Sequence, residues 1–477
     1  MIAWPFAVLA RAAIRAGFMP DITAPSLWRL ELRAMLRLSA PLAAANLLQM
    51  MVHTIDVMFV ARLGAIPLAA SSLSISIFGL AMWCFSGLTG AVAPLIAAEL
   101  GRRNHAVREV RRSVRMALWL AVLSGLLGMA ICAYGEAIML AAGQDPIVAE
   151  AAGRFMAVLL WAMIPMIASN VLRTFVSALG RPIFATAITA LAIGVNALGN
   201  YAFVFGHFGA PALGLEGSAV SSILTSLAML AAYVIAIQSD RRLRRYRIFG
   251  RWWRPEWSRM TEIARIGIPI FLTILAEAGL FSGAAFLMGR IGPTELAAHT
   301  VALQVAALAF QVPFGIGQAV TIRVGYYFGA GDRAGIARAG WSGLAMTVGF
   351  MMLPAAAMLL MPQLILMLYV DPSAPANAAM VSLAVQYMVI AAAFQLFDGI
   401  QAVAMGALRG LQDASVPMAI AIFGYWLPGM GTAVWLGFFT QLEGTGVWIG
   451  LAVGLTVVAG LLLRRWHRRE RLDLLPG

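Results

Sequence analysis

Three acidic residues, Asp56, Glu277 and Asp398, lie well inside apolar stretches that are long enough to span a membrane. A carboxylate at the centre of a bilayer costs about 2.5–3.5 kcal/mol on insertion scales, so it persists where a partner compensates it or where it carries ions. The sequence places no arginine at comparable depth, which makes a structural salt bridge the weaker explanation. A carboxylate that is buried without a cation readily takes up a proton or a metal cation. We therefore predict that these three residues couple the protein to an ion.

Polar side chains share a helical face with Asp56. Successive steps of three, four and three residues place four side chains on one face: Asn46, Gln49, His53 and Asp56. A polar face on a membrane helix turns toward the protein interior or a wet cavity. His53 is either a group that exchanges protons near neutral pH or a hydrogen-bonded structural group, and the sequence leaves both interpretations open.

Smaller polar sets occur on three other apolar stretches. Thr273 lies four residues before Glu277, and Gln395 and Gln401 flank Asp398. Asn196 and Asn200, also four residues apart, lie on one side of a further stretch. We expect these side chains to line a cavity. Its acids suit cationic, partly apolar ligands, and methionine and phenylalanine side chains provide an adaptable wall.

The composition excludes several classes of protein. Of the 477 residues, 61% are hydrophobic and 12% are charged, whereas a soluble domain has about a quarter charged. A water-soluble enzyme and a disordered chain are therefore excluded. The two cysteines, Cys84 and Cys132, lie in apolar stretches and provide neither a disulfide framework nor a metal site. The sequence predicts an all-α integral membrane protein.

Twelve stretches meet the length of about 20 apolar residues that a membrane-spanning helix needs. They lie near residues 39–61, 67–99, 113–139, 154–178, 183–206, 216–238, 263–289, 295–327, 340–361, 377–405, 414–436 and 446–463. Alternating the loops between the two sides puts every arginine except Arg62, Arg154 and Arg290 on one side. Because cytoplasmic loops are rich in arginine, we predict that both termini are cytoplasmic. The net charge of +13 then reflects these loops rather than nucleic-acid binding.

The sequence matches itself when it is shifted by 228 residues. The matched pairs include Pro41 with Pro269, Arg62 with Arg290, Gly64 with Gly292, Gly87 with Gly315, and Gly101 with Gly329. Six spans in each half is an even number, so both halves enter the membrane from the same side and form parallel repeats, a known transporter layout. We predict an N-lobe over 39–238 and a C-lobe over 263–463. The repeat aligns Gln49 with Glu277, so the two lobes differ in chemistry.

Three segments lie outside these lobes. We expect residues 1–38 to form a cytoplasmic N-terminal extension whose short apolar run over 1–20 is interfacial or poorly ordered rather than a signal peptide. Residues 239–262 form a cytoplasmic basic, tryptophan-rich linker, in which we expect a helix in the headgroup layer over 241–259. Residues 464–477 form a basic cytoplasmic tail.

Two details of the spans lead to further expectations. Glu99 and Glu136 lie near span ends, where we expect them to reach the lipid headgroups. Pro41 precedes Asp56 on the first span, where a proline removes a backbone hydrogen bond and permits bending. Pro41 is therefore a candidate hinge, with a passive kink at the start of the span as the alternative.

With these residues in place, the sequence resembles the multidrug and toxic compound extrusion (MATE) family, in its bacterial NorM-like branch. The similarity runs from about Leu38 to Arg465. The matching phrases are TIDVMFVARLGAIPLAA (54–70), NALGNYAFVFGHFGAPALGLEGSAV (196–220), ELAAHTVALQ (295–304), AVTIRVGYYFGAGD (319–332) and FDGIQAVAMGALRGLQDASVPM (397–418). Each phrase is a modest pattern, but together and in order they are specific.

The resemblance implies a secondary antiporter of the bacterial inner membrane that exports organic cations in exchange for Na⁺ or H⁺, with no cofactor. Glu277 and Asp398 match the acidic positions of cation coupling, and they are the metal ligands if the ion is sodium. Asp56 matches an aspartate of the first lobe that is implicated in protonation, and Asn196 and Asn200 match the polar pair beside it. Pro41 matches the position where the first helix is proposed to bend. Sodium-coupled members carry a tyrosine where this chain has Phe394, which favours protons and leaves the ion open.

Other functions remain open at this stage. A lipid-linked saccharide flippase of the same superfamily fold would call for cavity arginines, whereas the deep charges here are acidic. An intramembrane enzyme would need a nucleophile–base pair or a metal cluster, which Cys84, Cys132, His53 and His299 do not form by their spacing. A channel or a non-transporting membrane scaffold is a further alternative. Small organic cations and the bilayer are the expected partners, without nucleic acid, and we expect a monomer.

Overall fold

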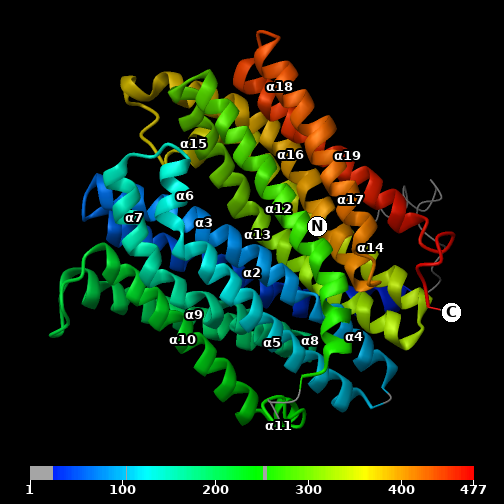
Figure 1. Ribbon diagram of the computed structural model, residues 1–477. Helices are drawn as coiled ribbons and strands as arrows, with labels where there is room; N and C mark the ends of the chain where they lie inside the picture. The colour runs from blue at the N-terminus through cyan, green and yellow to red at the C-terminus, as the bar shows by residue number, and fades with distance from the viewer. Residues whose placement is uncertain (1–24, 104, 251–254, 477) are drawn as a thin grey trace. The chain divides into compact units, whose positions relative to one another are not determined.

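The computed structural model describes residues 25–103, 105–250 and 255–476, and this part of the chain is built from helices (Figure 1). The apolar run over residues 1–20 lies outside the described residues. Twelve helices in the described part are long and apolar enough to cross a membrane. Their bounds are Leu27–Ala61, Ala65–Arg102, Ala106–Ala133, Pro146–Ala178, Ile183–Phe205, Leu215–Ser239, Trp257–Ile291, Pro293–Ala330, Arg333–Leu360, Pro375–Gly410, Ser415–Phe438 and Glu443–His467. The predicted fold class is confirmed.

The chain divides into two compact units. Unit 1 comprises Met1–Ala43 and Ala276–Gly477, and unit 2 comprises Ala44–Leu275. The divisions fall inside two continuous helices, α2 (Pro25–Ala61) and α12 (Trp257–Ile291). The lobes expected from the sequence assign all of α2 to the first half and all of α12 to the second. Each unit instead contains the first part of one of these helices and the remainder of the other.

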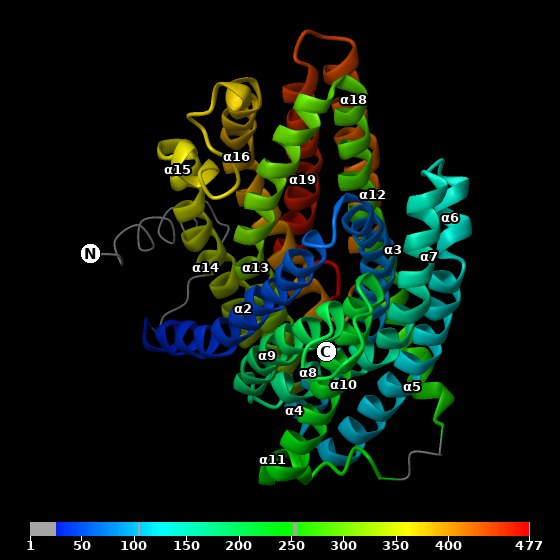
Figure 2. The same ribbon diagram turned by 90° about the vertical axis from the view of Figure 1, so that its left-hand side faces the viewer.

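Unit 2 contains nine further helices among its described residues. They are α3 (Ala65–Gly90), α4 (Val92–Arg102), α5 (Ala106–Ala133), α6 (Gly135–Ala141), α7 (Pro146–Leu159), α8 (Met163–Ala178), α9 (Ile183–Phe205), α10 (Leu215–Ser239) and α11 (Arg241–Arg244). Helix α3 packs against α5, α7 and α8, and α9 packs against α10 (Figure 2). The basic linker over 239–262 contains the single turn α11 and the first residues of α12 (Trp257–Ile291), and its residues 251–254 lie outside the described residues.

Unit 1 is organised around α13 (Pro293–Ala330) and α16 (Ala378–Gly410), which pack closely together. Its other helices are α14 (Arg333–Leu360), α15 (Pro362–Leu366), α17 (Ser415–Gly424), α18 (Gly431–Phe438) and α19 (Glu443–His467). A Cβ atom on Gly406 would lie 2.5 Å from the Gly317 carbonyl oxygen, so glycine allows the two backbones to meet. The hydroxyl of Thr321 donates to the Gly406 carbonyl oxygen at 2.9 Å and holds this contact in register.

The eleventh span changes its helical geometry in the middle. Between α17 and α18 lies one π-helical segment, η3, over Tyr425–Met430, which contains Pro428. A proline inside a helix cannot donate its backbone hydrogen bond, and a π turn adds a residue to the turn. The insertion sets the direction of the side chains that precede Pro428, among them Tyr425.

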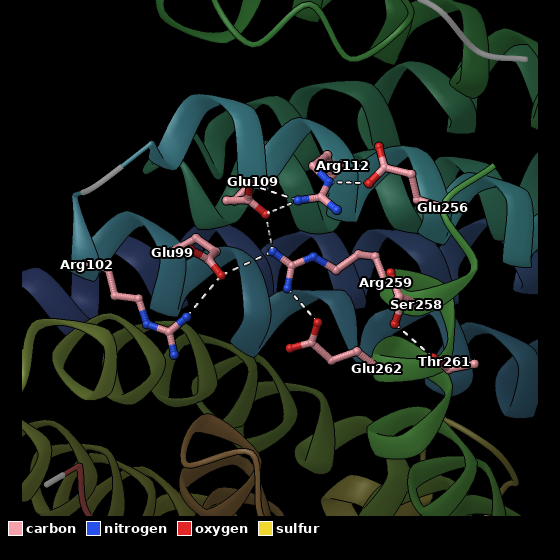
Figure 3. Close-up of polar contacts among 9 residues, drawn as sticks. All are labelled: Glu99, Arg102, Glu109, Arg112, Glu256, Ser258, Arg259, Thr261 and Glu262. Carbon is pink, nitrogen blue, oxygen red and sulfur yellow. Dashed lines mark hydrogen bonds and ion pairs between the residues drawn. The ribbon is translucent and has the colours of Figure 1, made fainter. Parts of the chain in front are cut away.

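The first part of α12 is held in unit 2 by a cluster of ion pairs (Figure 3). Arg259, with a side chain that is 10% exposed, lies 3.2 Å from Glu99 of α4 and 2.8 Å from Glu109 of α5. Arg259 also pairs with Glu262, and Arg112 pairs with Glu109. Glu99 is buried against this guanidinium, so the expectation that it reaches the headgroups is corrected.

The first part of α2 is held in unit 1 by a smaller cluster. Glu31, which is 3% exposed, accepts hydrogen bonds from Arg323 at 2.8 Å and from the Tyr327 hydroxyl at 2.7 Å, both on α13. Glu31 and Arg259 are 228 residues apart, and so are Glu99 and Tyr327. The same two positions of the repeat therefore contact each other in both units, as Glu31 with Tyr327 in unit 1 and as Arg259 with Glu99 in unit 2. This anchoring explains why α2 and α12 begin well before the apolar residues that marked their predicted starts.

We expect Arg259→Gln to destabilise the protein by on the order of 3 kcal/mol, because it removes the cation shared by the buried Glu99 and the partly buried Glu109, which then retain Arg102 and Arg112 as partners. The measurement is thermal unfolding of the purified chain in detergent. Arg154→Gln is the matched control, since Arg154 and its partner Glu150 are 61% and 64% exposed, and a surface pair contributes about 1 kcal/mol or less. Equal effects of the two substitutions would contradict the assigned role of the cluster.

Candidate functional site

Asp56 lies in a set of neutral hydrogen-bond donors in unit 2. The side-chain amides of Asn196 and Asn200, both on α9, donate to its Oδ1 atom at 2.8 Å and 2.7 Å. The hydroxyl of Ser222 on α10 makes a longer contact of 3.4 Å with its Oδ2 atom. His53, one turn earlier on α2, is exposed and lies close enough to Asp56 to interact with it electrostatically.

The two asparagines are held in place by their own backbone. Both are fully buried, and the amide of Asn200 also donates to the Asn196 carbonyl oxygen at 3.0 Å. Ser221 donates to the same oxygen at 2.9 Å. Asn196 and Asn200 are four residues apart on α9, which places them on one face of that helix. The sequence-predicted association of these two residues is thus a direct contact with Asp56.

A small hollow lies beside Asp56. It has a volume of about 120 Å³ and is lined by Ile55, Met58, Phe59, Arg62 and Ala197. Pockets for drug-sized ligands have volumes of about 300–1,000 Å³, so this hollow is too small to hold a drug.

The remaining polar residues of the α2 face have different surroundings. Asn46 is buried, and its Oδ1 atom accepts a hydrogen bond from the guanidinium of Arg173 on α8. Arg173 also interacts electrostatically with the buried Tyr233. Gln49 is partly buried. The helical face therefore contacts the basic Arg173 at Asn46 and carries the acidic Asp56.

The second acidic pair lies in unit 1. Glu277 on α12 and Asp398 on α16 are close enough to interact electrostatically, and Asp398 is 6% exposed. Arg409, at the end of α16, also interacts with Glu277. The expectation that these acids lack an arginine is therefore corrected at Glu277.

Neutral polar groups surround this pair. Gln401 and Tyr425 both lie beside Glu277, and Tyr425 also faces Asp398. Among the described residues, the Oδ1 atom of Asp398 and both amide atoms of the buried Gln395 have no hydrogen-bond partner. Unpartnered polar atoms in a protein interior mark places where a proton, an ion or water acts.

The charges of this pair do not balance. Asp398 interacts with Glu277, and Arg409 interacts with Glu277, so the three groups carry one net negative charge when all are ionised. Among the residues described, no group of three or more His, Cys, Asp or Glu side chains is placed to hold a metal ion.

Two other predicted residues have local roles in the packing. Thr273 is buried and donates to the Pro269 carbonyl oxygen at 2.8 Å, within its own helix. Phe394 is buried between Phe281 and Trp448, with ring centroids 6.1 Å and 5.5 Å away. Helix α2 continues through Pro41, so a hinge at this residue stays a prediction.

Arg409, Tyr425 and Ser222 are the site residues that the sequence reasoning missed. Arg409 lies eight residues after Gln401, which places both on the same face of α16, and this spacing is a signal that was available. Ser222 is one of many serines on apolar helices. Tyr425 is directed by the π turn, which a helical pattern of period 3.6 does not reveal.

The model of the MatE family matches residues 41–202 and 269–435 of the chain. A probable multidrug resistance protein NorM from Mesorhizobium japonicum is 45% identical over 447 residues, which cover 94% of this chain and 96% of the relative. The multidrug resistance protein NorM of Burkholderia vietnamiensis is 38% identical, over 90% of this chain and 92% of that protein.

Solved structures share the fold. A multidrug resistance MATE family transporter in an outward-facing conformation superposes with a TM-score of 0.83 at 20% identity, covering 96% of this chain and all of the other. A eukaryotic MATE transporter superposes with a TM-score of 0.82 at 20% identity, covering 94% of this chain and all of the other. At this identity, the likeness establishes the twelve-span fold.

We expect Asn200→Ala to destabilise the protein by about 1–3 kcal/mol, because it removes a buried donor to Asp56. Ser222→Ala is the matched control, and its long contact predicts a smaller effect. The measurement is thermal unfolding of both variants in detergent, each also combined with Asp56→Asn. A double-mutant cycle should show coupling between Asp56 and Asn200, and additive effects would contradict the contact.

Proposed function

Because the chain belongs to the MatE family, it is an ion-coupled, multi-pass membrane transporter, and we propose that it exports organic cations in exchange for Na⁺ or H⁺. Its relatives named NorM are described as multidrug resistance proteins, which supports a broad set of drug-like cargo. We further propose that it lies in a bacterial cytoplasmic membrane with both termini in the cytoplasm, since arginine concentrates in the loops on one side.

The observation that carries this proposal is the charge imbalance at Glu277 and Asp398. A buried negative charge without a full counter-charge is costly, so the site favours binding of a cation or a proton. Arg409 remains charged under all physiological conditions, so the carboxylates are the groups whose state changes. Binding of the coupling ion removes the net charge of the pair.

This neutralisation couples binding of the ion to release of the cargo. An organic cation is held by negative charge, so neutralising the acids weakens its binding and favours its release. Loss of the ion on the other side of the membrane restores the charge and the affinity for the next cargo cation. The ion gradient then drives the cycle, since the chain contains no lysine and hence no phosphate-binding GxxxxGK motif.

Asp56 is proposed as a second site of ion exchange. Its partners Asn196, Asn200 and Ser222 donate hydrogen bonds without carrying charge. These partners therefore do not cancel the negative charge of the carboxylate, and the exposed His53 lies one turn earlier on α2. Gln49 and Asn46 are proposed to contact cargo from the same helix.

Drug efflux from proteoliposomes tests the proposal. We expect the full-length chain to move ethidium or norfloxacin under a sodium gradient alone or under a pH gradient alone, and the active gradient identifies the ion. Asp398→Asn and Glu277→Gln should abolish this efflux, because each removes a charge that the ion neutralises. Glu150→Gln, at a side chain 64% exposed, is the control and should retain it. Full efflux by both site variants would refute the proposal. Absence of efflux by the unsubstituted chain under both gradients would refute it as well.

Phe394 provides a test of ion selectivity. Hard cations such as sodium prefer oxygen ligands, and Phe394 places a ring without oxygen one turn before Asp398. We expect Phe394→Tyr to raise the efflux rate under a sodium gradient relative to the rate under a pH gradient. The measurement is the ratio of the two rates in matched proteoliposomes. An unchanged ratio in a variant of normal thermal stability would remove Phe394 from the determinants of selectivity.

A further inference from the structure

A basic hollow lies in unit 2 where α10 ends. It has a volume of about 340 Å³ and combines two arginines with an apolar wall: Arg244, Arg247, Gln238, Ile237, Ile248 and Phe249. Ile237 and Gln238 belong to the last turn of a candidate membrane span, Leu215–Ser239. The hollow therefore begins at the depth where a membrane helix meets the lipid headgroups.

The segment that forms the hollow is folded rather than loosely attached. Asp240 begins α11 by accepting hydrogen bonds from the backbone N–H groups of Arg242 at 2.8 Å and Leu243 at 3.2 Å. Leu243 and Ile248 are buried, at 0% and 1% exposure. Alternation of buried apolar and exposed basic residues gives the segment one inner and one outer face.

Tyr246 attaches the segment to the helices beneath it. Its carbonyl oxygen accepts a hydrogen bond from the guanidinium of Arg111 on α5 at 2.6 Å. Its ring packs edge-on against Phe175 of α8, with centroids 5.7 Å apart. The positions of Arg244 and Arg247 on either side of Tyr246 are thereby set by contacts with two membrane helices.

Among the residues that the structure describes, no acidic side chain pairs with the arginines of the hollow. Asp240, the one acid between residues 238 and 250, pairs with Arg181 at 3.3 Å. Within the described ranges, Arg244 and Arg247 form no ion pair, and both side chains are exposed. Two neighbouring guanidinium groups with no carboxylate form an anion-binding arrangement that matches the geometry of a phosphate group.

We propose that this hollow binds the phosphodiester headgroup of an anionic phospholipid, with Arg244 and Arg247 on the phosphate and an acyl chain along the partly exposed Phe249. The apolar wall and the membrane-level position favour a lipid over a soluble phosphate compound. A zwitterionic headgroup would bring its own ammonium group toward the arginines, so phosphatidylglycerol should bind more tightly than phosphatidylcholine. The inference is independent of the proposed transport activity.

The test is lipid titration of the delipidated, detergent-purified full-length chain, followed by native mass spectrometry. We expect the double variant Arg244→Gln/Arg247→Gln to weaken phosphatidylglycerol binding about tenfold or more, as expected for the loss of two charge-assisted contacts. The matched control is Arg241→Gln/Arg245→Gln, which removes the same charge from exposed residues of the same segment outside the hollow. The control should bind within about twofold of the unsubstituted chain.

Each alternative outcome has a defined meaning. Equal weakening by the two double variants would overturn the site, because it would show diffuse attraction by the basic segment. Equal binding of phosphatidylcholine and phosphatidylglycerol would overturn the anionic-lipid assignment. Displacement of the lipid by glycerol phosphate at equal concentration would assign the phosphate contact to a soluble ligand and overturn the lipid. Thermal unfolding of both double variants without lipid provides the control for folding.

Discussion

The cost of placing charge in a medium of low polarity governs this protein, and its helices meet that cost in three ways. At Arg259, ionic partners surround the charge and leave it neutralised. At Asp56, neutral amides and a hydroxyl solvate the charge without cancelling it. At Glu277 and Asp398, a guanidinium interacts with one of the two carboxylates, Glu277. The first arrangement attaches α12 to α4 and α5, whereas the other two leave a negative charge without full compensation.

The repeat shows how one frame supports these different arrangements. Positions 228 residues apart keep their place in the packing but exchange their chemistry: Glu31 corresponds to Arg259, and Glu99 to Tyr327. In each unit the first turns of a long helix are held by a side chain at this pair of positions: Tyr327 contacts Glu31 in unit 1, and Glu99 contacts Arg259 in unit 2. At the alignment of Gln49 with Glu277, a neutral side chain in one half corresponds to a charged one in the other. The two halves thus share the positions that attach α2 and α12, but they carry their deep acids at different positions.

The sequence predicted the spans because hydropathy over about 20 residues is a strong signal. Helical spacing predicted that Asn196 and Asn200 share a face of α9, and the family resemblance implied that they lie beside Asp56. The sequence did not predict the starts of α2 and α12, where buried ion pairs extend the helices past the apolar residues. Nor did it predict Tyr425, because this residue lies in a π turn, where a helical period of 3.6 residues does not hold. Hydropathy and helical period therefore located the acids but not the basic and phenolic groups that set their charge balance.

The chain carries its positive charge on 34 arginines and no lysine, and this choice bears on how charge varies during a cycle. Arginine keeps its proton even when it is buried, whereas a buried lysine loses it readily. Arg409 beside Glu277 and Arg173 beside Asn46 are therefore constant positive charges. Any change of net charge inside either unit must come from a carboxylate, a histidine or a bound ion.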